Sequence, residues 1–140
     1  MREILFRGRD KEGCWNFGNL VHLRCEVRGE ATTEVFKIHP IKINGAEYPT
    51  VVDPETVGQY TGLEDKNGKK IFEGDILLLP GFCMGEEYIA ESKAVVVWHD
   101  GGWELQEITE NSPAYVLDHD SATDMEVVGN IYDNPELTEE

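Results

Sequence analysis

Residues 53–76 read DPETVGQYTGLEDKNGKKIFEGDI, and this stretch decides the fold class of the 140-residue chain. Asp53 followed by Pro54 and Glu55 is typical of the start of a helix, and Gly58 limits that helix to one turn. The rest of the stretch alternates turn residues with β-forming residues. It therefore predicts short strands joined by tight turns rather than helices.

Two turns within this stretch are specified by glycine. Asn67-Gly68 supplies residues that accept a positive φ between the expected strands 59–63 and 69–72. Gly74, in Glu73-Gly74-Asp75, predicts a second turn before the apolar strand 76–79. A third turn, at Asp100-Gly101, fits type I′ geometry. We therefore assign Asn67, Gly68, Gly74 and Gly101 to structural turns.

Short apolar runs alternate with turn residues along the rest of the chain, at intervals of about 8–12 residues, which is typical of a barrel or sandwich. Alternating polar and apolar residues, or short β-prone apolar runs such as 94–98, predict further strands at 3–8, 20–27, 33–38, 88–89, 94–98, 103–108 and 126–132. Trp98 follows a run of valines and is expected in the core. The sequence thus predicts an all-β fold with at most short helical turns.

Three blocks of sequence resemble the YopX family of phage and prophage proteins. They are MREILFRGR at residues 1–9 with Trp15 and Gly18-Asn19-Leu20, the stretch 53–76, and EVVGNIYDNPEL at residues 126–137. The resemblance implies a small SH3-type β-barrel, here with an additional N-terminal β region, and implies no established activity and no catalytic residues. We expect an N-terminal β region at 1–52 and an SH3-like barrel region at 53–140, sharing one core.

Composition places the chain among cytoplasmic globular proteins. Hydrophobic residues make up 40% of it, enough for a packed core. We find no apolar run long enough to span a membrane and no signal peptide, so we expect a location in the bacterial host cytoplasm. Cys14, Cys25 and Cys83 are odd in number and widely spaced, which indicates reduced thiols. Cys83 is expected in an exposed, flexible loop.

Charge is distributed unevenly along the sequence. The net charge is −16, yet residues 1–50 carry 8 Lys/Arg against 7 Asp/Glu, whereas residues 51–140 carry 4 against 21. An acidic C-terminal part repels phosphates, so we expect no direct binding to nucleic acid. Acidic surfaces commonly serve solubility alone, but this one is also suited to a basic partner or to imitating a nucleic acid.

Histidines flanked by carboxylates are the candidate metal or catalytic residues. His99 precedes Asp100, and His119 lies between Asp118 and Asp120. Imidazole with carboxylates can hold a divalent metal or perform acid–base chemistry. Both sites also lie beside turn residues, where Asp is expected for backbone reasons. We therefore expect no metal, no cofactor and no enzymatic activity, and keep a metal-dependent enzyme as the last alternative.

Aromatic residues in glycine-rich surroundings are the candidate binding residues. Most large aromatic side chains in a domain of this size belong to the core, but Trp15 and Phe82 have loop-like neighbours. The leading hypothesis is a non-enzymatic module that binds a host or phage protein, with an acidic nucleic-acid mimic that inhibits a host DNA-binding or defence protein as the alternative. We also expect a homo-oligomer through the nearly neutral N-terminal region.

Overall fold

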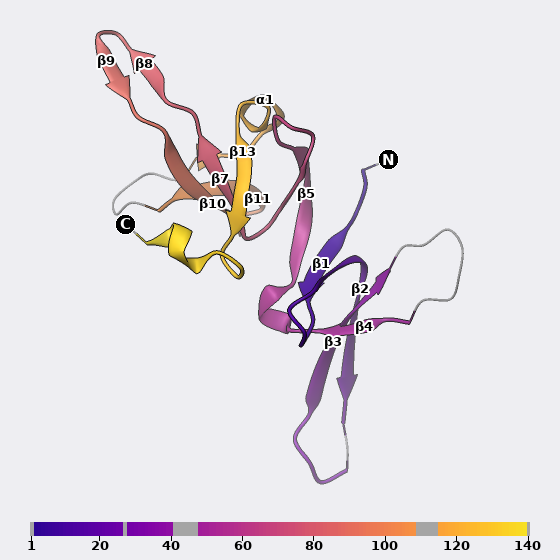
Figure 1. The fold of residues 1–140 in the computed structure, drawn as a ribbon. Helices are drawn as coiled ribbons and strands as arrows, with labels where there is room; N and C mark the ends of the chain where they lie inside the picture. Colours follow the sequence, from indigo (N-terminus) through magenta and orange to yellow (C-terminus); the bar gives the residue numbers. More distant parts are fainter. Residues whose placement is uncertain (1, 27, 41–47, 109–114, 140) are drawn as a thin grey trace. The chain divides into compact units, whose positions relative to one another are not determined.

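The computed structural model describes residues 2–26, 28–40, 48–108 and 115–139. Its contacts divide the chain into two compact units, Met1–Tyr60 and Thr61–Glu140 (Figure 1). The expected boundary lay after residue 52. The first residues of β5 (Gly58–Glu64) instead belong to the first unit, because Gly58 pairs with β1 and the Tyr60 N–H donates to the Leu5 carbonyl at 2.8 Å.

The first unit is an antiparallel sheet. Its strands follow the order β4-β3-β2-β1-β5 and form the first five strands of a six-stranded sheet that ends on β6, a strand from the residues of the second unit. Besides β5 they are β1 (Phe6–Arg9), β2 (Trp15–Cys25), β3 (Thr33–Pro40) and β4 (Thr50–Val52). The long β2–β3 hairpin pairs continuously from Gly18 with Pro40 to Cys25 with Thr33. Ile38 and Val52, from β3 and β4, are buried in this unit.

The helix-start signal at Asp53 produces the short 3-10 helix η1 (Pro54–Thr56). The Asp53 carboxylate accepts a hydrogen bond from the Glu55 N–H at 3.0 Å, as an N-cap does. The Asp53 N–H donates to the Arg9 carbonyl, and the Arg9 N–H donates to the buried Thr56 hydroxyl, at 2.8 and 2.9 Å. The predicted single helical turn is confirmed. Its hydrogen bonds to Arg9 connect β1 to the start of the 53–76 stretch.

The second unit is built on an open five-stranded antiparallel sheet in the order β12-β11-β10-β7-β13. Its strands are β7 (Asp75–Leu79), β10 (Ser92–His99), β11 (Gly102–Glu107), β12 (Tyr115–Val116) and β13 (Glu126–Asn130). The second unit also contains β6 (Lys70–Phe72), which neighbours β5 in the six-stranded sheet. It further contains the two-stranded hairpin of β8 (Phe82–Met84) and β9 (Glu87–Ile89). Helical turns are α1 (His119–Ala122) and η2 (Pro135–Thr138).

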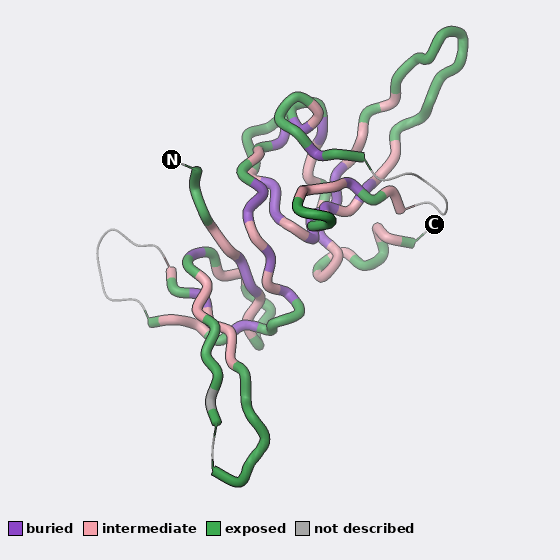
Figure 2. The backbone as a smooth tube through the Cα atoms, turned by 180° about the vertical axis from the view of Figure 1, so that it is seen from behind, coloured by how far each residue is buried: buried purple, intermediate pink, exposed green. Residues whose placement is uncertain are grey.

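The core cluster of the second unit is built on neighbouring strands of this sheet. Leu77, Val96 and Leu105, from three neighbouring strands, are fully buried. The same cluster includes Ile71, Ala94, Leu117, Ala122 and Met125. Figure 2 shows the buried segments gathered in the sheet strands, while the β8–β9 hairpin is exposed along its length.

The all-β class is confirmed, but the expected SH3-type closed barrel is wrong. Among the described strands, the outer strands β12 and β13 of the second unit do not pair with each other. The sheet stays open because β12 is only two residues long. Asp118 caps α1 two residues after the end of β12, so the chain turns into a helix there instead of extending β12 into a strand that could pair with β13.

Two further expectations are corrected. Cys83 lies in strand β8 rather than in a loop, and its side chain is exposed. Trp98 is 55% exposed rather than buried. Its strand alternates correctly, but Trp98 lies beyond the core at the β10–β11 turn, where its ring meets Trp103 edge-on at 4.8 Å. Asp100 and Gly101 both have positive φ in this turn, as type I′ geometry requires.

Asp65 organises the turn at residues 65–69. Its Oδ1 accepts hydrogen bonds from the N–H groups of Asn67 and Lys69, both at 2.9 Å. Its Oδ2 accepts from the Val127 N–H at 2.9 Å and so ties the turn to β13. The Gly68 N–H donates to the Asp65 carbonyl at 3.0 Å, and Gly68 has the expected positive φ of 79°. Asn67 does not have a positive φ, so glycine alone supplies the left-handed residue of this turn.

The same turn occurs in the first unit. Asp10-Lys11-Glu12-Gly13 matches the pattern of residues 65–68, and Asp10 Oδ1 accepts from the N–H groups of Glu12 and Cys14 at 3.0 and 2.9 Å. Gly13 has φ 84°. Asp10 is more exposed than Asp65, and its other oxygen accepts from the Asn16 side-chain amide at 3.2 Å.

Candidate functional site

His99 lies at the end of β10, beside the β10–β11 turn. Its ring Nδ1 is 3.3 Å from a carboxylate oxygen of Glu104, and most of the imidazole is exposed. An exposed imidazole beside one carboxylate is an ordinary surface ion pair when protonated. The flanking Asp100 occupies the turn, so the sequence pattern at this position is explained by backbone geometry.

The Asp118-His119-Asp120 group forms the start of α1. Asp118 Oδ1 accepts from the Ser121 N–H at 2.8 Å, and the Ser121 hydroxyl accepts from the Asp118 N–H at 3.1 Å. The Ser121 N–H is the main reason that the pKa of Asp118 is held below its usual range. His119 Nδ1 lies 3.5 Å from Asp120, and both side chains are exposed.

These candidates do not converge on one site. Across the described ranges, no group of three or more His, Cys, Asp or Glu side chains is arranged to hold a metal ion. In the same residues, no helix has the length and apolar character needed to cross a bilayer.

Trp15 packs against cations of its own unit. The Arg7 guanidinium lies 4.6 Å from the centre of the Trp15 ring, and the Arg9 guanidinium lies 6.0 Å from it. Arg7 is itself buried. Guanidinium groups over an indole face contribute to stability, and they occupy ring surface that a ligand would otherwise contact. This geometry gives Trp15 a role in folding, and its binding role stays a prediction.

Phe82 has the surroundings expected of a binding residue. It begins β8, pairs with Ile89 of β9, and is 53% exposed. The remaining pairs of the hairpin are Cys83 with Tyr88 and Met84 with Glu87, and all six residues are exposed. Figure 1 shows the hairpin projecting beyond the end of β7 and the start of β10. Large apolar side chains on a projecting hairpin are unusual unless something covers them.

A groove of about 390 Å³ lies at the base of this hairpin, entirely within the second unit. Phe82 and Ile89 of the hairpin line it together with Tyr115 and Val116 of β12. Val116 is 72% exposed. The remaining lining residues are Leu79, Pro80, Ala90, Ser92, Glu107, Ser121, Asp124 and Met125. We call this the hairpin groove.

The hairpin groove is acidic as well as apolar. Among the described residues, its lining contains two carboxylates, Glu107 and Asp124, and no Lys, Arg or His. The Ser92 hydroxyl donates to Glu107 at 3.4 Å, which holds that carboxylate at the groove. Residues 61–140 as a whole contain 4 Lys/Arg and 19 Asp/Glu, a net charge of −15.

A larger hollow of about 800 Å³ lies in the first unit, beside the Asp10 turn. Its lining combines cations, Arg9 and Lys11, with the anions Asp10, Glu12 and Asp53. Mixed charges at one surface compensate one another, and the apolar side chains of its described lining are Val51 and Val52. This hollow therefore has less of the character of a binding site than the hairpin groove.

Sequence reasoning identified Phe82 and missed the rest of the groove. Tyr115 and Val116 form a strand of two residues, too short to produce a periodic pattern. The signal that was present is the density of apolar residues in Phe82-Cys83-Met84 and Tyr88-Ile89, on both sides of a Gly-Glu-Glu tip. That pattern is a hairpin with apolar arms.

Comparisons with known proteins agree on family and fold. A family model described as "YopX protein" matches residues 5–139. The solved structure of protein EF1440 from Enterococcus faecalis is similar, with a TM-score of 0.59 and 24% sequence identity, over 99% of this chain and 100% of that one. At this identity the likeness concerns the fold alone. No curated protein matches the chain.

Proposed function

The chain belongs to the YopX family, and we propose that it is a non-enzymatic module that binds another protein through the hairpin groove of its second unit. The observation that carries this proposal is the exposure of large apolar side chains around one hollow. Phe82, Tyr115 and Val116 are each close to half exposed or more. Clustered apolar side chains of this kind mark interaction surfaces in soluble proteins.

A binding role is preferred to a catalytic one because of how the candidate residues are used. Asp118 caps α1 with its carboxylate, and His99 pairs with Glu104 on the surface. Neither arrangement provides a nucleophile with a base, or a base held in a cleft. We further propose that the protein is of phage or prophage origin and acts in the cytoplasm of the bacterial host.

The test compares two aromatic truncations. Phe82→Ser removes a ring from the groove, and Tyr48→Ser removes an 85% exposed ring from the first unit, as a matched control. Proteins retained from host extract are identified, and the affinity of each is then measured with purified components. We expect Phe82→Ser to weaken binding by about 2 kcal/mol, or roughly 30-fold. Equal binding by both variants would refute the proposal.

Acidic mimicry of a nucleic acid is the second candidate, and the net charge of −15 in residues 61–140 favours it. A mimic binds the DNA-binding surface of its partner, so duplex DNA should compete with the chain. Its affinity should also fall steeply as salt is raised to about 0.5 M, because salt screens exposed charges. Phe82→Ser would then have little effect, which separates the two candidates.

A further inference from the structure

The described lining of the hairpin groove is mostly apolar, and its charged side chains, Glu107 and Asp124, are both acidic. This combination restricts what the groove can bind. A hollow of about 390 Å³ lies at the lower end of the range for ligand pockets, about 300–1,000 Å³. It therefore suits one or two large side chains of a partner segment. The cluster Phe82, Ile89, Tyr115 and Val116 offers these side chains an apolar contact surface.

Charge decides between the occupants of the groove. Glu107 and Asp124 are part of the lining, and Glu86, Glu87 and Glu91 are exposed along the adjoining hairpin. A second copy binding through the same surface would place like charges against one another, which costs affinity and slows encounter. A segment that carries Lys or Arg would gain from both effects.

Resting on the proposed function, we infer that the partner segment is basic and apolar. It has a bulky apolar side chain seated among Phe82, Ile89, Tyr115 and Val116, and it has flanking Lys or Arg side chains on Glu107 and Asp124. The apolar side chain supplies most of the affinity, because it is the part removed from water. The cations supply selectivity and the rate of association.

Synthetic peptides of one length test the inference against the full chain. The first carries a central Leu-Phe pair flanked by lysines, the second replaces the lysines with glutamates, and the third replaces Leu-Phe with serines. Fluorescence anisotropy of labelled peptides gives each Kd. We expect the first peptide to bind at least about tenfold more tightly than either of the others.

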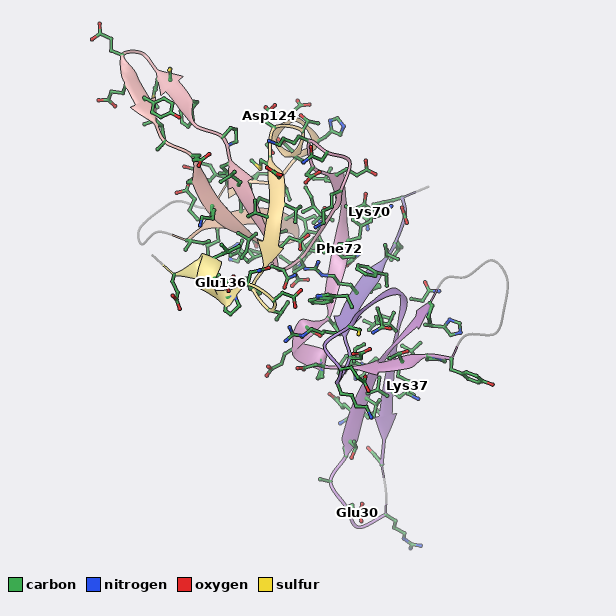
Figure 3. The ribbon with its side chains drawn as sticks, viewed as in Figure 1. Glu30, Lys37, Lys70, Phe72, Asp124 and Glu136 are labelled. Atoms are coloured by element: carbon green, nitrogen blue, oxygen red, sulfur yellow. The ribbon has the colours of Figure 1, made fainter. Side chains whose placement is uncertain are left out.

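Matched variants locate the binding. Val116→Ser should weaken the first peptide about fivefold, whereas Val128→Ser, an exposed valine of β13 outside the groove lining, should change nothing. Glu107→Gln and Asp124→Asn should each weaken it about two- to fivefold and reduce its salt dependence. Glu136→Gln is the charge control, and Figure 3 shows Glu136 well apart from Asp124 within the second unit. Circular dichroism and a thermal melt establish that each variant folds.

The outcomes are separable. If the glutamate peptide binds as tightly as the lysine peptide, the inference is wrong while the proposed function stands. The inference also fails if the serine peptide binds equally well, because the apolar groove is then irrelevant. A dimer in light scattering that Val116→Ser dissociates would identify a second copy as the occupant, against the inference. Failure of the proposed function has a different signature: purified partners that bind Phe82→Ser and wild type alike.

Discussion

Replacing Asp65 with alanine should destabilise the second unit by about 3–5 kcal/mol. Asp65 is 5% exposed and accepts from three backbone N–H groups, those of Asn67, Lys69 and Val127. A buried donor left without an acceptor costs about 1–3 kcal/mol. The N–H groups of Asn67 and Lys69 lie in the turn, where water can partly replace the carboxylate, so the loss of each is expected at the lower end of this range. The Val127 N–H lies in strand β13, so leaving it without an acceptor should cost more, toward the upper end of the range.

Urea unfolding measures the loss. Tryptophan fluorescence reports mainly on the second unit, which holds Trp98 and Trp103, while the first unit holds Trp15. Far-UV circular dichroism follows the whole chain. Asp10→Ala is the matched control, because Asp10 accepts from the equivalent turn N–H groups but is more exposed and makes no bond to a distant strand. We expect a clearly smaller loss for Asp10→Ala. Equal losses in the two variants would show that burial and the bond to Val127 contribute nothing.

Acidification should remove part of the stability that the Asp65 carboxylate provides. Burial alone would raise the pKa of Asp65, but hydrogen bonds from Val127, Lys69 and Asn67 outweigh it and hold the pKa below its usual range. A lowered pKa in the folded state means that the stabilisation is present above the unfolded-state pKa and is lost as pH falls through the folded one. Asp65→Asn should therefore be less stable at neutral pH and lose less stability on acidification, as measured by urea midpoints. Parallel pH profiles for wild type and variant would contradict this assignment.

Other substitutions test the backbone and the assembly. Gly68→Val should cost about 1–2 kcal/mol from left-handed strain alone, since a Cβ at this position meets nothing within 4 Å; an unchanged melting temperature would contradict this. Gly18→Ala should unfold the β2–β3 hairpin, because its Cβ would collide with the His39 carbonyl, whereas Gly102→Ala, which has open space, should melt like wild type. Light scattering should give twice the 15.8 kDa of one chain or a higher multiple, and Arg24→Glu, in the N-terminal region, should lower that mass; a mass of one chain would exclude the oligomer.

Local chemistry made much of the fold predictable. Asp53, Gly68 and Gly101 determine their own backbone geometry through caps and positive φ, so the sequence is sufficient to locate those turns. Alternation located most strands to within a few residues. It failed at Trp98, because period two identifies a face of the sheet but not where the core ends along the strand. Barrel closure was equally beyond reach, since it depends on which distant strands pair.

The candidate site was less predictable than the fold. Phe82 stood out as a large aromatic residue in loop-like, glycine-rich surroundings. Val116, in contrast, contributes to the groove only through the β11–β12 pairing. The third hydrogen bond of Asp65 comes from Val127, which is 62 residues away in sequence. Contacts over such separations are properties of the assembled sheet, and a single sequence does not display them.

The position of strand β5 across the unit boundary bears on proteolysis and on recombination between related genes. Its first residues bond to β1, and its later residue Thr61 donates to the Ile71 carbonyl at 2.8 Å. The boundary between the units therefore falls inside a hydrogen-bonded strand and not in a linker. A protease that nicks exposed loops has no preferred target at Tyr60–Thr61. A recombination event there would leave both fragments with half a strand, so we expect the two units to be inherited together.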